Sequence, residues 1–185
     1  MRVNIFRKVN RGDKVRTETA KKEKMQALLL ELTEENRLAV EMSMRYGMRI
    51  GDVLATKTED VRKGRWTYRE EKTGKTRRIT LSAALQEALL SKAGKIYVFE
   101  HRLDYKRHRT RQAVFKDVKR AAAAFRLAEN VAPHSYRKRY AVNAYKKYGG
   151  DLKKVQRLLN HSDPMITMLY ALADELTQKK RTLKK

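Results

Sequence analysis

Apolar residues recur along most of this chain at intervals of three and four, which is the spacing of an amphipathic helix. The stretch that begins at Lys21 is typical, with Met25, Leu28, Leu29 and Leu32 on one helical face. The pattern predicts helices over residues 21–32, 33–47, from about 48 onward, 82–94, 109–130, 134–150, 151–160 and 161–176.

Capping residues mark several of these helix ends. Thr33 and Asp151 each precede a helical pattern, and their side-chain oxygens can accept a hydrogen bond from its first turn. Gly47 should end the second helix, because glycine readily adopts the left-handed conformation found at helix C-termini. For the last helix the expected cap is Ser162 or Asp163.

One stretch, RWTYREEKTGKTRRITL, shows the period of two that is typical of a strand. Trp66, Tyr68 and Glu70 share one face, a Thr-Gly pair interrupts the alternation, and apolar residues then resume it. The pattern predicts a hairpin that carries Lys72 and Lys75 at its tip. The apolar stretch IYVF predicts a brief extended segment. The expected fold class is therefore mainly α with a small antiparallel β-hairpin or sheet (α+β).

The formal net charge of +24, from 45 basic and 21 acidic residues, points to a polyanionic partner. Double-stranded DNA is the leading candidate, because neutralising phosphates releases counterions and gives strong binding. A general adaptation for solubility is the alternative. The absence of cysteine excludes disulfides and thiolate metal sites.

We expect the chain to divide into a basic N-terminal arm at residues 1–22, one folded domain at 23–177 and a basic C-terminal tail at 178–185. No apolar run approaches the roughly 18 residues of a membrane span. We therefore expect no membrane partner.

Two pairs of residues have the spacing of neighbours on a helix. His134 and Arg137 are three apart and share a helix face. Arg49 begins the third predicted helix, and Asp52 follows one turn later as a plausible carboxylate partner. A histidine beside a fixed arginine suggests proton transfer next to an anion.

Three further residues complete a possible reaction centre: Lys72 at the hairpin tip, His161 before a helix cap, and Tyr170 nine residues on. A tyrosine oxygen can attack a DNA phosphodiester and form a covalent phosphotyrosine. Two arginines can stabilise the transition-state charge, while a histidine and a lysine move protons. Such chemistry needs no metal or other cofactor.

The segments YGMRIGDVLAT, EKTGKTRRITLS, HSYR and LLNHSDPMITMLY together resemble the catalytic motifs of the tyrosine recombinases, also called the phage integrase family. The resemblance covers roughly Thr33 to Leu176. It implies a fold like that family's catalytic domain, with Asp52 in a supporting role. The six positions that match, here called the catalytic set, are Arg49, Lys72, His134, Arg137, His161 and Tyr170.

The family resemblance implies a site-specific recombinase or integrase of a mobile element or virus, which cleaves and rejoins DNA through a 3′-phosphotyrosyl intermediate. It also implies a cytoplasmic protein that associates with the nucleoid of a prokaryotic or viral host cell. Because recombination needs paired sites, it implies a homotetramer on DNA that is a monomer or dimer when free. The segment after the tyrosine often docks on a neighbouring protomer in this family.

Basic residues outside the catalytic set are predicted to contact the DNA backbone: Lys75, Arg77, Arg78, Arg107, Arg109, Arg111, Lys138 and Arg139. Two positions depart from the family's usual pattern. Asn160 stands where glycine commonly precedes the second histidine, and asparagine tolerates the left-handed conformation. Lys138 stands where histidine is frequent.

Two alternatives stay open from the sequence. A type IB topoisomerase would use nearly the same chemistry to relax supercoils without defined sites. A catalytically silent DNA-binding module would keep the charge without the reaction, although the intact catalytic set speaks against it.

Overall fold

The structure is a computed structural model that describes residues 22–160. The elements in this range are α1 (Lys22–Leu30), α2 (Glu34–Tyr46), α3 (Ile50–Leu54), α4 (Thr58–Arg62), β1 (Arg65–Arg69), β2 (Thr76–Thr80), α5 (Ala83–Leu90), β3 (Glu100–His101), β4 (Asp104–His108), α6 (Arg111–Ala124), α7 (Pro133–Lys147) and α8 (Leu152–Leu159). The mainly helical fold class with small antiparallel strands is confirmed. The helix predicted over 161–176, with its cap, lies outside the described residues.

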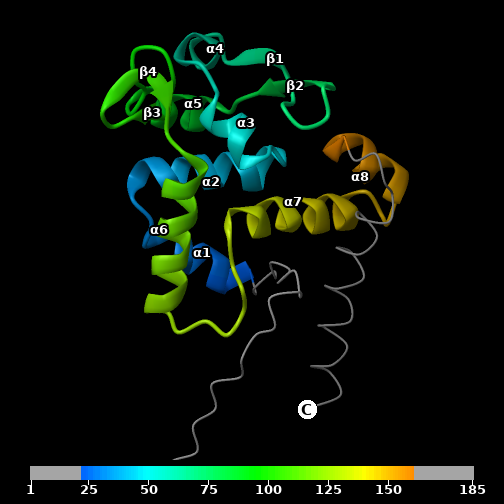
Figure 1. Ribbon diagram of the computed structural model, residues 1–185. Coiled ribbons are helices and arrows are strands. Elements are labelled where there is room, and N and C mark those ends of the chain that lie inside the picture. The colour runs from blue at the N-terminus through cyan, green and yellow to red at the C-terminus, as the bar shows by residue number, and fades with distance from the viewer. Residues whose placement is uncertain (1–21, 161–185) are drawn as a thin grey trace, which may run out of the picture.

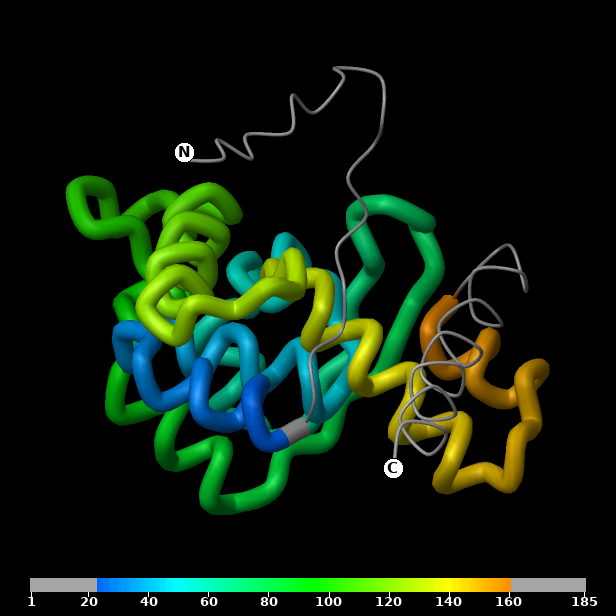
Figure 2. The backbone as a smooth tube through the Cα atoms, turned by 90° about the horizontal axis from the view of Figure 1, so that it is seen from below, coloured from blue at the N-terminus to red at the C-terminus, as the bar shows by residue number. Residues whose placement is uncertain are grey.

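Helix α2 occupies the middle of the described fold (Figure 1). It packs along α7, and α1 and α6 lie to one side of this pair. The two strand pairs, with α4 and α5, lie on the opposite side of α2 from α7 (Figure 1). Helix α8 follows at the end of α7, away from α1 and α6 (Figures 1 and 2).

One apolar core joins most of these elements. It contains fully buried residues of α1, α2, α3, α6 and α7, among them Leu28, Met42, Leu54, Val114 and Tyr136. Burying each large aliphatic side chain stabilises the fold by about 1.5–3 kcal/mol. A separate small cluster, made of Ala141, Ala144, Val155 and Leu159, fixes α8 against α7.

The predicted hairpin is confirmed. Strands β1 and β2 pair antiparallel with Trp66 opposite Ile79, and both side chains are buried. The turn with its Lys72 and Lys75 lies on the side of the molecule that α8 occupies (Figures 1 and 2).

The sequence pattern missed a second hairpin and a short helix. Strand β3 pairs with β4 through a two-residue turn, but none of the side chains of these strands is buried. Without an apolar face the strands lack the alternation that predicts them. Helix α4 is only five residues long, too short to show a helical period.

Two predicted helices differ from the observed ones at their ends. The helix predicted over 109–130 ends at Ala124, because Arg126 takes a left-handed conformation with φ of 49°. The helix predicted over 82–94 ends at Leu90. Asp151 caps α8 as predicted, since its carboxylate accepts a hydrogen bond of 2.8 Å from the Lys154 N–H.

Thr33 occupies the N-cap position of α2, but its side chain does not cap the helix. Its hydroxyl and its backbone N–H both donate to Asp117, at 3.1 and 2.9 Å, and Asn36 donates to the same oxygen at 2.8 Å. The side-chain capping prediction is therefore wrong, and Thr33 instead ties the start of α2 to α6.

Gly47 ends α2 as predicted. It has a left-handed φ of 65°, and its N–H donates to the Ser43 carbonyl at 2.9 Å. The ring of Tyr140, on α7, lies directly where a Cβ atom at position 47 would stand. The close approach of α2 and α7 therefore depends on the missing side chain.

We expect Gly47→Ala to lower the free energy of unfolding by two contributions. The left-handed conformation costs about 1–2 kcal/mol, and overpacking against Tyr140 adds about 1–3 kcal/mol. Gly149→Ala is the matched control, because Gly149 has φ of 59° but no atom within 4 Å of a Cβ. Urea unfolding measures both variants, and equal losses would show that the Tyr140 contact is unimportant.

Candidate active site

Arg49 stands at the N-cap position of α3, two residues after the turn at Gly47. Its side chain is 20% exposed, and its Nη1 donates to Oε2 of Glu70 at 2.6 Å. Its Nε and Nη2 atoms make no protein hydrogen bond within residues 22–160. The guanidinium is therefore held at one end and open at the other.

Glu70 lies at the end of β1 and is almost fully buried, with 1% of its surface exposed. Its carboxylate also accepts hydrogen bonds from the Thr73 hydroxyl at 2.6 Å and from Nη1 of Arg77 at 3.4 Å. Burial opposes its ionisation, but the bonds from Thr73 and Arg49 and the charges of Arg49 and Arg77 prevail, so the pKa of Glu70 lies below its ordinary value. Glu70 is thus an ionised carboxylate inside the protein.

Asp52 is buried one turn along α3 from Arg49. Its Oδ1 accepts a hydrogen bond of 3.0 Å from the Glu71 N–H, which fixes the end of the hairpin to α3. Its Oδ2 is buried and has no hydrogen-bond partner among the described residues. Burial, aided by the charge of Glu70, raises the pKa of Asp52 above its ordinary value.

Arg137 projects from α7 and is 2% exposed, so it is not a solvated surface charge. Its Nη1 donates to the Gly47 carbonyl, and its Nη2 donates to the Leu159 carbonyl at 2.7 Å. Loss of hydration, together with the charges of Arg49 and Arg77, lowers its pKa to about 10, and the group stays charged at neutral pH. A buried cation whose partners among residues 22–160 are carbonyls attracts an anion strongly.

His134 lies on α7 one turn before Arg137, and water reaches its ring. Its pKa is lowered to about 4, by loss of hydration first and then by the cations Lys138, Arg137, Arg49 and Lys72. Exposure moderates the desolvation, but burial and these four cations all act in the same direction. The ring is therefore neutral at pH 7 and can accept a proton.

Lys72 is exposed at the turn of the β1–β2 hairpin, and its charge acts on His134. Lys75, also exposed, follows on the other side of Gly74. The structure therefore brings four members of the catalytic set together from α3, the hairpin and α7, namely Arg49, Lys72, His134 and Arg137.

The other two members of the catalytic set, His161 and Tyr170, lie outside the described residues. The chain that leads to them leaves α8 through Asn160, which has a left-handed φ of 51°. The left-handed conformation, which asparagine tolerates, explains how it replaces the usual glycine. The Leu159 carbonyl just before it is bonded to Arg137.

The predicted DNA contacts differ in their surroundings. Lys75, Arg78, Arg107 and Arg111 are exposed. The side chain of Arg77 is 11% exposed and donates to the carbonyls of Tyr46 and Gly47 at 2.7 and 3.0 Å, so it supports the site from inside. Arg109 donates to Asn36 at 3.2 Å. Lys138 is partly buried on α7.

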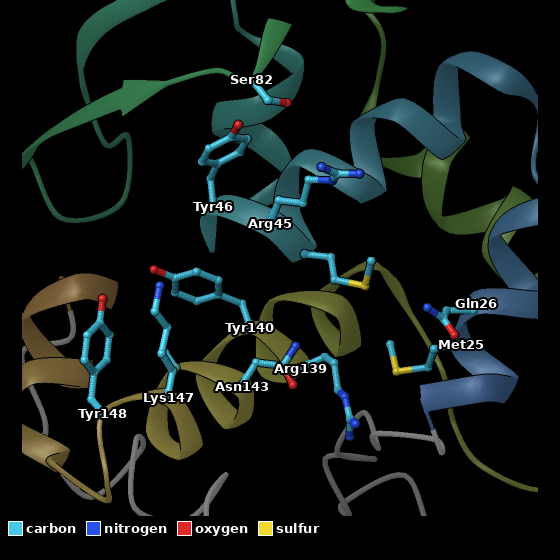
Figure 3. A pocket seen from close by; sticks show the side chains of 12 residues that line it. Met25, Gln26, Arg45, Tyr46, Ser82, Arg139, Tyr140, Asn143, Lys147 and Tyr148 are labelled. Atoms are coloured by element: carbon cyan, nitrogen blue, oxygen red, sulfur yellow. The ribbon is translucent and has the colours of Figure 1, made fainter. Parts of the chain in front are cut away.

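Arg139 lines a pocket of about 550 Å³ between α1, α2 and α7 (Figure 3). In Figure 3 the ring of Tyr140 points from α7 toward α2, and Lys147 and Tyr148 stand beside it. None of the four described members of the catalytic set lines this pocket. This pocket and the cluster of cations are therefore separate features of the described residues.

The sequence did not single out Glu70 as a functional residue. It stands on the same strand face as Trp66 and Tyr68, where the alternation calls for an apolar side chain. A carboxylate at a position that faces inward could have indicated such a role, because buried carboxylates require partners.

Within residues 22–160, no group of three or more His, Cys, Asp or Glu side chains is arranged to hold a metal ion. No helix in the same range is long and apolar enough to cross a membrane. The local charge is set by Arg49, Arg77, Arg137 and Lys72 against Glu70 and Asp52. The described side chains of the cluster therefore carry an excess of positive charge, which suits an anion.

Comparison with known proteins places these features in context. The family model for the phage integrase family matches residues 18–176. The chain is 32% identical over 136 residues to the probable integrase/recombinase YoeC of Bacillus subtilis (strain 168), a match that covers 70% of this chain and 73% of that protein.

Solved structures share the fold at lower identity. The crystal structure of XerA recombinase matches with a TM-score of 0.67 and 16% identity, over 91% of this chain and 65% of that one. A lambda integrase dimer bound to a COC′ core site matches with a TM-score of 0.67 and 22% identity, over 86% of this chain and 60% of that one. This chain thus spans less than two thirds of each.

We expect the stability of the protein to fall as the pH is lowered from about 6.5 to about 4. In this window the unfolded chain binds a proton at position 134 that the folded protein does not, so unfolding is favoured. Nuclear magnetic resonance of the imidazole Cε1–H gives the folded pKa directly, and urea unfolding at several pH values gives the slope.

His134→Gln assigns the resonance and should make the pH dependence of stability weaker in the same window. A His134 pKa at or above 6.5 in the free protein would contradict the electrostatic description of the site.

Proposed function

Because the chain belongs to the phage integrase family, the tyrosine recombinases, we propose that it is a site-specific recombinase or integrase that breaks and rejoins DNA strands. The observation that carries this proposal is the cluster of Arg49, Lys72 and Arg137 around His134, in which hydrogen bonds to Glu70, Gly47 and Leu159 hold the two arginines. Residues far apart in sequence form a cationic cluster with a proton acceptor at its edge. A phosphodiester is the anion that such a cluster suits.

In the proposed reaction Arg49 and Arg137 hold the non-bridging oxygens of the phosphate. The open Nε and Nη2 atoms of Arg49 can donate to it, and the buried charge of Arg137 stabilises the negative charge that builds in the transition state. Positioned donors of this kind are each worth roughly a factor of 10²–10³ in rate. His161 adds a further hydrogen bond.

Tyr170 is the proposed nucleophile. Its oxygen bonds to phosphorus while the bond to the 5′ oxygen breaks, and His134 accepts the tyrosine proton. Lys72 gives a proton to the departing 5′ oxygen. A 5′-hydroxyl then attacks the 3′-phosphotyrosine and restores the phosphodiester, so the covalent link conserves the bond energy and ATP is not required.

The proposed substrate is double-stranded DNA at a defined site. The lambda integrase structure, a dimer on its core site, supports both a DNA partner and assembly on it. We extend this to a homotetramer on paired sites, because exchange of strands needs two duplexes. Lys75, Arg78, Arg107 and Arg111 are the exposed cations proposed to hold the backbone, with Arg109, Lys138 and Arg139 beside them.

We expect Tyr170→Phe to bind DNA with unchanged affinity and to form no covalent adduct, since only the attacking oxygen is lost. The wild type and the variant are incubated with nicked fragments of the source genome, and SDS-stable adducts are trapped and sequenced. Adducts in the variant would place the nucleophile elsewhere. Relaxation of supercoils without a preferred trapped sequence would favour a type IB topoisomerase.

Lys72→Ala should slow cleavage of the trapped site by about 10²–10⁴-fold, because the departing oxygen loses its acid. Lys75→Ala removes the same charge from the other side of the turn and should leave the single-turnover rate within about threefold, the change expected when one exposed charge is lost. The reverse order of effects would transfer the acid role to Lys75.

A further inference from the structure

Glu70 binds three side chains, of which Arg49 has a task of its own in the proposed reaction and Thr73 lies next to Lys72, which has another. Its Oε2 accepts from Nη1 of Arg49 and from the Thr73 hydroxyl, both at 2.6 Å. Its Oε1 faces Nη1 of Arg77 at 3.4 Å. One buried carboxylate therefore links a phosphate clamp, the turn next to Lys72 and an internal arginine.

The link to the hairpin turn is reinforced by the backbone of Glu70. Its carbonyl accepts a hydrogen bond from the Gly74 N–H, and its N–H donates to the Lys75 carbonyl, both at 2.9 Å. The five-residue segment that contains Lys72 is thus closed by the backbone of Glu70 and tied by its side chain. Glu70 thus anchors the backbone of the turn that carries Lys72 and binds Arg49 at the same time.

Through Arg77, Glu70 is also linked to Arg137, the other arginine of the catalytic set. Arg77 and Arg137 donate to the same carbonyl oxygen, that of Gly47. Glu70 offsets part of the repulsion among Arg49, Arg77 and Arg137, which lie close enough for Arg49 and Arg77 to act on the charge of Arg137.

We propose that Glu70 is a positioning residue that holds Arg49 and the Lys72 turn in the geometry for phosphate cleavage. It does not contact the phosphate itself, because its oxygens are occupied by Arg49, Thr73 and Arg77 and its surface is closed to solvent. By binding only Nη1 of Arg49 it aims the remaining donors of that side chain outward. This inference rests on the proposed function.

Glu70→Gln tests the charge while keeping the shape of the side chain. Residues that position a catalytic group typically contribute about 10–100-fold in activity, and we expect a loss of that size in the single-turnover rate of adduct formation. DNA affinity should stay unchanged. Glu71→Gln is the matched control, because it removes the same charge from the exposed next residue and should leave the rate unchanged.

A double-mutant cycle separates positioning from a general loss of structure. Because Glu70 also holds the Lys72 turn, Glu70→Gln should still slow cleavage in an Arg49→Ala background, but by a clearly smaller factor than in the wild type. Equal losses with and without Arg49 would overturn the inference.

If Glu70→Gln does not fold, Thr73→Val removes one of the same hydrogen bonds from the turn. It should slow cleavage of an ordinary phosphodiester, and less so that of a 5′-bridging phosphorothiolate, whose sulfur leaves without an acid. No effect of Thr73→Val on the ordinary substrate would contradict the link between Glu70 and the Lys72 turn.

A measurement without catalysis distinguishes failure of this inference from failure of the proposed function. In ¹⁵N-labelled protein the bound Arg49 guanidinium should give resolved, slowly rotating Nη signals, assigned by their loss in Arg49→Lys. These signals should broaden in Glu70→Gln. If that variant does not fold, they should shift in Thr73→Val. Unchanged signals in the folded variant would overturn the inference. Absence of wild-type adducts on any DNA would instead refute the proposed function.

Discussion

The site depends on keeping positive charge inside the protein without neutralising it. Arg137 is withdrawn from water, yet its described partners are carbonyl oxygens of Gly47 and Leu159 rather than carboxylates. Carbonyl dipoles satisfy the N–H groups but leave the full charge in place. The burial of Arg137 therefore lowers stability unless an anion arrives, and the surrounding apolar core offsets this cost.

The rest of the described architecture can be understood as support for that arrangement. The left-handed turn at Gly47 presents its carbonyl to α7, and α8 ends where the Leu159 carbonyl meets the same guanidinium. The buried carboxylate of Glu70 does not pair with Arg137 directly. It restrains the neighbouring Arg49 and Arg77, so the net charge of the cluster stays positive.

Local patterns in the sequence were sufficient to predict the main helices, the β1–β2 hairpin and the turn at Gly47, because each depends on residues near one another in the chain. The second hairpin could not be predicted, since its strands bury no side chain. Four described members of the catalytic set were named from motifs, and the structure brings them together. The contacts of Glu70 with Arg49 and of Arg77 with Tyr46 and Gly47 could not be predicted, because they join residues 21 to 31 positions apart.

The single carbonyl oxygen of Gly47 serves both Arg77 and Arg137, and the same residue leaves room for Tyr140. Residues 47, 77, 137 and 140, which lie on three separate segments, therefore constrain one another. A substitution at any of them alters what the other three can accommodate, so these positions should drift slowly and together over evolutionary time. We expect residues 47, 77, 137 and 140 to change together among relatives of this chain, because their contacts meet at one residue.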